Sequence, residues 1–260
     1  MKRTLFLSLL PLALASAGCG PLFELDLFPG PYFGDQKKVQ IVTSGELFAN
    51  ADVREARMVG SLERVTLVPL EPLGQVRVES SAPAVVAIRE QPSTDSVCCV
   101  ANGGGWRCER VVDPCTGVVE PVRAIDVEAK AEGRARLRLV ASDGHEVDGA
   151  NLVTAEAASS ELVVGKEVAR RGDHLLVHVG DEVSYTVTVR SAAGQELRAP
   201  GVAALSSADA ATVGLLEETL FRGDTAASAG THGILRALRA GSTTLTPFRG
   251  RPVVVDVEAR

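Results

Sequence analysis

The sequence predicts an all-β protein that contains two tandem β-sandwich domains. Three observations support this prediction: short runs of alternating apolar and polar residues, turn residues between these runs, and a match of the chain with itself. In residues 183–189, Val, Tyr, Val and Val alternate with Ser, Thr and Thr, so one face of this strand is expected in a core and the other in water. No window after the N-terminal segment shows convincing helical periodicity.

Residues 1–18 have the composition of a secretory signal peptide. Two basic residues follow Met1, a short apolar run extends over 5–14, and small residues precede Cys19. The apolar run is shorter than the roughly 20 residues that a membrane-spanning helix needs. We therefore expect residues 1–18 to be removed from the mature protein.

The residues before Cys19 allow two kinds of processing. Ala15–Ala17 suits an ordinary signal peptidase and a secreted protein, whereas Ser16–Cys19 resembles a lipoprotein box, in which the cysteine is acylated and becomes the first mature residue. The chain has five cysteines, and a lipid on Cys19 leaves an even number for disulfides in an oxidising compartment. We therefore predict lipidation of Cys19. Because Gly20 replaces the aspartate of inner-membrane lipoproteins, the resemblance favours the outer membrane.

A tether is predicted at residues 19–38, because residues 20–37 contain three Pro and three Gly. Loss of residues 1–18 would change the net charge from −6 to −8, since both charged residues there are basic. An acidic surface argues against binding to nucleic acid and against electrostatic binding to anionic lipid. The lipid on Cys19 would therefore hold the protein at the membrane.

The rest of the chain contains an internal repeat. A shift of 120 residues aligns 45–75 with 165–195 without a gap and gives seven identities in 31 positions. Gly60 and Gly180 are one of these identical pairs.

A pair of Ser-Ser motifs extends the repeat. Ser80–Ile88 matches Ser206–Val213 at an offset of 126 residues, and all matched segments occur in the same order in both halves. We therefore predict two copies of one domain, at 39–158 and 159–260, each long enough to bury its own core.

Strand-like runs and turn signals follow one another through both copies. The runs lie at 65–70, 76–78, 85–88, 125–129 and 134–140 in the first copy and include 183–189 and 253–257 in the second. The turn signals include Ser142–Gly144, Asp148-Gly149, Ala193-Gly194 and Arg249-Gly250. Short strands separated in this way are typical of a β-sandwich.

Three features recur in both copies. An apolar residue precedes Gly60 and Gly180, a Ser-Ser motif follows a long alternating strand, and a further strand begins at Gly133 and at Gly241. Together they resemble the bacterial immunoglobulin-like domains of group 2, which are related to invasin and intimin. The resemblance implies an immunoglobulin-like β-sandwich for each copy. The tryptophan that this family often places before the Ser pair is absent, because the single tryptophan, Trp106, lies elsewhere.

The first copy contains an insertion that the second copy lacks. Ser80 and Gly133 are 53 residues apart, whereas Ser206 and Gly241 are 35 residues apart. The excess corresponds to residues from about 97 to 116. This segment contains Cys98, Cys99, Cys108, Cys115 and Trp106.

The four cysteines of the insertion predict two disulfides. A bridge between adjacent cysteines is strained, so two pairings remain. They are Cys98 with Cys108 and Cys99 with Cys115, or Cys98 with Cys115 and Cys99 with Cys108. A zinc site of four thiolates is the alternative, but its usual cysteine spacing is missing, and we predict no metal. Trp106 is a possible recognition residue, or else it covers the bridges as part of a small core.

The sequence shows no catalytic constellation: the serine-hydrolase, zinc-protease and phosphate-loop motifs are absent. We predict that the protein is not an enzyme and needs no cofactor. It would be a lipoprotein of the cell envelope whose immunoglobulin-like domains act as a spacer and interaction platform. The alternative is a ligand- or polysaccharide-binding accessory protein that uses the Cys-rich insertion. The expected partners are the membrane, through the lipid on Cys19, and an envelope protein or polysaccharide, without nucleic acid.

Overall fold

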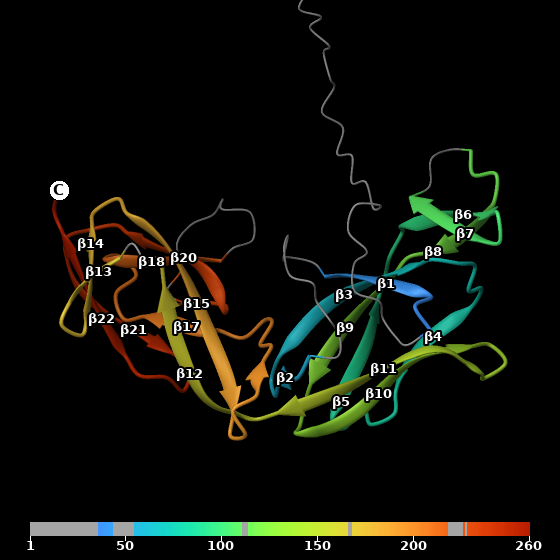
Figure 1. The fold of residues 1–260 in the computed structure, drawn as a ribbon, viewed down its shortest axis with the longest axis horizontal. Coiled ribbons are helices and arrows are strands. Elements are labelled where there is room, and N and C mark those ends of the chain that lie inside the picture. The colour runs from blue at the N-terminus through green and yellow to red at the C-terminus, as the bar shows by residue number, and fades with distance from the viewer. Residues whose placement is uncertain (1–35, 44–54, 111–113, 166–167, 218–225, 227) are drawn as a thin grey trace, which may run out of the picture.

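The computed structural model describes residues 36–43, 55–110, 114–165, 168–217, 226 and 228–260. Every regular element in these ranges is a β-strand, and the strands form two β-sandwiches and one small sheet (Figure 1). The predicted signal peptide, Cys19 and nearly all of the predicted tether lie outside the described residues. Within the described ranges, no helix has the length and hydropathy needed to cross a membrane.

The first sandwich consists of two four-stranded sheets. One sheet has the strand order β1 (Val39–Thr43), β3 (Leu62–Pro69), β9 (Arg123–Ala129) and β5 (Val86–Gln91). The other has the order β2 (Arg57–Met58), β11 (Glu146–Ala155), β10 (Gly133–Ala141) and β4 (Val76–Ser80). Neighbouring strands are antiparallel except for β2 and β11, which run parallel.

The second sandwich also consists of two sheets. One has the order β12 (Ala157–Val164), β15 (Glu182–Ser191), β20 (His232–Ala237) and β18 (Val213–Glu217), and β16 (Glu196–Leu197) also pairs with β15. The other has the order β13 (Ala169–Arg171), β14 (His174–His178), β22 (Val253–Glu258), β21 (Gly241–Pro247), β17 (Leu205–Ser207) and β19 (Ser228–Ala229). Here β14 and β22 form the parallel pair.

The two sandwiches have the same topology. The order β1-β3-β9-β5 corresponds to β12-β15-β20-β18, and the parallel pair of β2 and β11 corresponds to that of β14 and β22. These sheets correspond to the two facing sheets of the immunoglobulin fold. The predicted fold class, two tandem immunoglobulin-like β-sandwiches, is therefore confirmed. The limits of the two domains at 39–158 and 159–260 stay predictions.

The repeated glycines Gly60 and Gly180 have the same structural role. Both have a φ of +91°, in the left-handed region that favours glycine. The Gly60 N–H donates to the Ala129 carbonyl at 2.7 Å, and the Gly180 N–H donates to the Ala237 carbonyl at 2.8 Å. In both copies this turn leads the chain from one sheet of the sandwich to the other.

The two Ser-Ser motifs lie at equivalent turns, but their predicted alignment is wrong by one residue. The Val86 N–H donates to the Ala82 carbonyl at 2.9 Å, and the Val213 N–H donates to the Asp209 carbonyl at 3.0 Å. Equivalent residues are therefore 127 positions apart, instead of the predicted 126. The two equivalent turns therefore begin at Ala82 and at Asp209.

Each sandwich encloses an aliphatic core between its two sheets. The first core includes Val65, Leu67, Ile125, Leu137 and Leu152, and the second includes Val187, Val189, Leu235, Leu245 and Val255. The predicted alternation in residues 183–189 is confirmed, because its apolar side chains are at most 6% exposed. Burial of these side chains is the main favourable contribution to folding of each sandwich.

Three of the four predicted turns are confirmed, and one is wrong. Ser142–Gly144, Ala193-Gly194 and Arg249-Gly250 lie between strands. The fourth pair, Asp148-Gly149, lies inside β11, and Asp148 is only 1% exposed. Crowding explains this glycine, because a Cβ atom there would lie 2.5 Å from Glu146 Oε1 and 3.0 Å from the Leu137 carbonyl oxygen.

Strand β2 joins the two sandwiches. On one side it pairs with β11 of the first sandwich. On its other side the Met58 N–H donates to the Arg198 carbonyl, and the Arg198 N–H donates to the Ala56 carbonyl, both at 2.8 Å. Close by, the Leu62 N–H donates to the Pro200 carbonyl at 3.0 Å. Backbone hydrogen bonds therefore continue from a sheet of the first sandwich into the second.

The junction also contains a buried network of charged side chains. The Glu63 carboxylate lies 2.5 Å from Arg57 Nη1 and 2.9 Å from Arg198 Nη2. Arg57 is 1% exposed and Glu63 is 6% exposed. Because Glu63 belongs to β3 and Arg198 follows β16, one carboxylate connects arginines of both sandwiches.

Candidate functional site

The insertion of the first sandwich forms a separate three-stranded sheet. Its strands are β6 (Ser96–Asn102), β7 (Gly105–Arg110) and β8 (Val118–Pro121), in the order β7-β6-β8. The sheet lies on the side of the first sandwich that faces away from the second (Figure 1). It extends past the predicted end of the insertion at residue 116, because β8 pairs with β6 along Ser96–Cys99.

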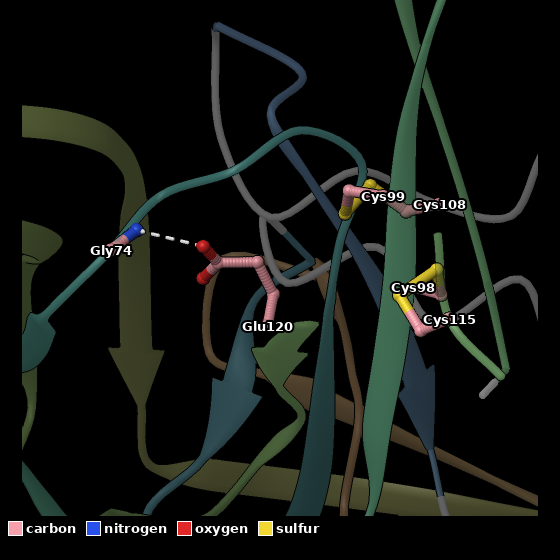
Figure 2. The surroundings of a disulfide bond; sticks show 6 residues. All are labelled: Gly74, Cys98, Cys99, Cys108, Cys115 and Glu120. Atoms are coloured by element: carbon pink, nitrogen blue, oxygen red, sulfur yellow. Dashed lines mark hydrogen bonds between the residues drawn. A yellow bond between two sulfur atoms is a disulfide. The ribbon is translucent and has the colours of Figure 1, made fainter. Parts of the chain in front are cut away.

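Two disulfides connect the strands and loops of this sheet, as predicted. One, the outer bridge, joins Cys98 to Cys115, and the other, the inner bridge, joins Cys99 to Cys108 (Figure 2). Of the two predicted pairings, the structure has the second. Successive residues of a strand point to opposite faces, and Cys99 lies directly opposite Cys108 in the pairing of β6 with β7. All four sulfurs are bonded in pairs, so they are not available as zinc thiolates.

A small core fixes the base of the insertion to the sandwich. Cys99 is completely buried, Val97 is 3% exposed and Val122 is 7% exposed, and Val68 of β3 packs against them. On β8, the buried Glu120 carboxylate accepts a hydrogen bond from the Gly74 N–H at 3.2 Å (Figure 2). The inner bridge and Glu120 thus attach the small sheet to two separate parts of the first sandwich.

Trp106 lies outside this small core. It pairs with Ala101 near the tip of the β6–β7 hairpin, and 44% of its surface is exposed. Valine side chains cover the inner bridge instead. Burial against the disulfides therefore does not account for Trp106, and its role in recognition stays a prediction.

Trp106 lines an open cleft of about 670 Å³ between the hairpin tip and the start of the first sandwich. The hairpin wall consists of residues 101–106. The opposite wall consists of residues 36–38 with Leu70 and Glu71. The sequence indicated the Cys-rich insertion and Trp106 as a possible recognition residue, but it did not indicate a cleft or the residues of the opposite wall.

Asp148 holds the second wall in place. Its buried carboxylate accepts hydrogen bonds from the backbone N–H groups of Gln36 at 3.0 Å, Lys38 at 3.2 Å and Gly149 at 2.8 Å. The Leu70 N–H donates to the Lys38 carbonyl at 2.9 Å, and Lys38 Nζ lies 2.9 Å from Glu71 Oε1. Sequence reasoning missed Asp148 because its partners are backbone groups more than 100 residues away.

Among the described residues, no group of three or more His, Cys, Asp and Glu side chains is arranged to hold a metal ion. A second groove, of about 500 Å³, lies at the junction of the sandwiches beside Glu55, Gln195 and Arg198. The cleft beside Trp106 is the only one of the two that involves the predicted site residues.

Comparisons with known proteins concern the fold only. No model of a protein family matches the sequence, and no curated protein matches it. Among solved structures, domains 5–6 of the S-layer protein SbsC are 14% identical, with 84% of this chain and 99% of that chain covered and a TM-score of 0.28. The Escherichia coli adhesin FdeC is 14% identical, with 85% of this chain and 64% of that chain covered and a TM-score of 0.27. The fibronectin(III)-like modules of Clostridium thermocellum CbhA are 10% identical, with 85% of this chain and 94% of that chain covered and a TM-score of 0.24. No conclusion about function rests on likenesses of this size.

Proposed function

We propose that this protein is a non-enzymatic lipoprotein of the cell envelope, in which two immunoglobulin-like sandwiches act as a rigid spacer and interaction platform. The observation that supports a spacer is the junction, where β2 makes backbone hydrogen bonds to both sandwiches. The buried contact of Glu63 with Arg57 and Arg198 adds a side-chain connection. A spacer needs such a junction, because domains joined only by a flexible linker move relative to one another.

The two disulfides support the proposed location outside the cytoplasm. Disulfides form and persist in the periplasm, at cell surfaces and in secreted proteins, and they are rare in the reducing cytosol. Both bridges of the insertion are structural, since they fasten a sheet that has only a small core of its own. Attachment to the outer membrane would come from the lipid on Cys19, at the end of a tether of residues 19–38.

Small-angle X-ray scattering tests the rigid spacer. We expect the mature chain with Cys19→Ser, which cannot be acylated, to give a scattering curve that fits one arrangement of the two sandwiches. The curve should not change with ionic strength, because salt screens a buried ion pair much less than an exposed one. A curve that requires a range of angles between the sandwiches would contradict the proposal.

Mass spectrometry of the natural mature protein tests the anchor. We expect an N-terminal Cys19 that carries acyl chains, and we expect Cys19→Ser to move the protein from the membrane fraction to the soluble fraction. An unmodified N-terminus at Gly18 would instead support the secreted alternative.

A second candidate function is that of a ligand-binding accessory protein that uses the Cys-rich insertion. The specific observation in its favour is the cleft beside the exposed Trp106. This function is compatible with the spacer, since the insertion lies away from the junction of the sandwiches.

A further inference from the structure

The cleft beside Trp106 has two walls that are fixed independently of each other. The disulfide between Cys99 and Cys108 braces the hairpin, and Trp106 is two residues from Cys108 on β7. The buried carboxylate of Asp148 holds the backbone of Gln36 and Lys38 in the other wall. A binding site whose parts are ordered before the ligand arrives loses less conformational entropy on binding. Each wall of the cleft is therefore ordered by contacts within the protein, before a ligand arrives.

The lining of the cleft combines one aromatic surface with many polar groups. Among the described residues that line the cleft, Trp106 is the only aromatic side chain, and Lys37 also belongs to the lining. Gln36 and Asn102 provide side-chain amides, each with donor and acceptor atoms. Lys38 and Glu71 form an ion pair at 2.9 Å, which offers further donors and acceptors without net charge. The backbone of Gly103–Gly105 at the hairpin tip is exposed and adds more polar groups.

This combination fits a sugar ring better than it fits other ligands. One face of a pyranose ring presents C–H groups that stack on an aromatic plane, while its hydroxyl groups need nearby donors and acceptors. A lipid bilayer would have to remove water from the amides and the ion pair without replacing their hydrogen bonds. An apolar peptide would meet the same cost, since Leu70 is the only large aliphatic side chain in the described part of the lining.

We propose that the cleft binds an oligosaccharide, with a sugar ring stacked on Trp106 and hydroxyl groups bonded to the amides and to the ion pair of Lys38 and Glu71. The proposal rests on the second candidate function, ligand binding through the insertion, and it specifies the site and the ligand class.

Fluorescence titration tests the proposal directly, because Trp106 is the only tryptophan in the chain. The mature chain with Cys19→Ser is titrated with cellohexaose, laminarihexaose, maltohexaose and chitohexaose, and separately with phosphatidylcholine vesicles. We expect a saturable change of Trp106 emission with at least one hexasaccharide and no change with vesicles. Calorimetry then gives the affinity of each variant for that hexasaccharide.

Matched variants separate the site from general effects on folding. We expect Trp106→Ala to weaken binding about tenfold or more, as for a central aromatic anchor, and Trp106→Phe to retain part of the affinity. Leu238→Ala, which removes a similarly exposed apolar side chain from the second sandwich, should bind normally. Asp148→Asn should weaken binding although Trp106 is intact. Asp143→Asn, in the exposed turn between β10 and β11, should leave binding unchanged.

Three outcomes would overturn the proposal: no binding of any of the four hexasaccharides, binding that survives Trp106→Ala, or a response to vesicles alone. The last outcome would assign the cleft to the membrane surface. Failure of the spacer function is detected separately, because it appears in the scattering curve, which Trp106→Ala should leave unchanged.

Discussion

Replacement of Glu63 by alanine is expected to lower the free energy of unfolding by about 3–5 kcal/mol, the range found when one partner of a buried ion pair is removed. The substitution would leave Arg57, which is 1% exposed, without its carboxylate. Within the described part of the chain, Arg57 Nε and Nη1 have no hydrogen-bond partner, so the ion pair with Glu63 is the contact that compensates for the burial of this charge. Denaturant unfolding of Glu63→Ala and of the unsubstituted chain measures the difference.

A neighbouring ion pair provides the control. Arg64 follows Glu63 in β3, and its Nε lies 2.9 Å from the Asp126 carboxylate, but 55% of the Arg64 side chain is exposed. Arg64→Ala is expected to lower the free energy of unfolding far less than Glu63→Ala does, because solvent and salt weaken exposed pairs. If Glu63→Ala costs no more than Arg64→Ala, the buried network does not stabilise the junction.

A double replacement tests whether the charges of Arg57 and Glu63, or only the packing of their side chains, stabilise the junction. Arg57→Met with Glu63→Leu removes the charges of the two most buried members of the network and keeps apolar side chains of comparable length. Arg198 loses Glu63 but keeps its other carboxylate partner, Glu55, at 3.2 Å. Replacement of a whole buried ion pair by apolar residues is often neutral or stabilising. We therefore expect the double variant to be more stable than Glu63→Ala, and its scattering curve would show whether the arrangement of the sandwiches depends on the charges.

Loss of the inner disulfide is the second change with a large expected effect. Cys99→Ser with Cys108→Ser removes a chain constraint worth on the order of 2–4 kcal/mol. It also places a hydroxyl group at position 99, which is completely buried among valines. We expect amide hydrogen exchange to become fast throughout residues 96–121, while β3 and β9 of the sandwich remain protected.

The outer disulfide is the matched control. Cys98→Ser with Cys115→Ser removes a constraint over 17 residues, compared with nine for the inner bridge. The chain-entropy contribution of the outer bridge is therefore at least as large, but Cys98 and Cys115 are only partly buried. We expect the inner double variant to be less stable than the outer one. The reverse order would show that burial of Cys99 contributes little.

The sequence alone determined the fold class, the internal repeat and the place of the insertion. Alternating residues such as those of 183–189 follow directly from the geometry of a strand with one buried face. Gly60 and Gly180 revealed the repeat, because the same left-handed turn requires glycine in both copies. The cysteines predicted a disulfide-linked insertion, because four of the five lie within residues 98–115, in a segment that the second copy lacks. All of these signals are local in the sequence or depend on residue type.

Only the tertiary structure decided which cysteines pair, what forms the cleft and how the sandwiches are joined. The choice of Cys108 as the partner of Cys99 depends on the register of β6 with β7. Asp148 acts on backbone groups more than 100 residues away, and its sequence pattern resembled a turn. The sequence around Glu63 and Arg198 does not distinguish them from surface charges, but the folded chain places both at the junction of the sandwiches. Contacts between distant segments depend on the packing of whole sheets, and alternation and residue type do not specify that packing.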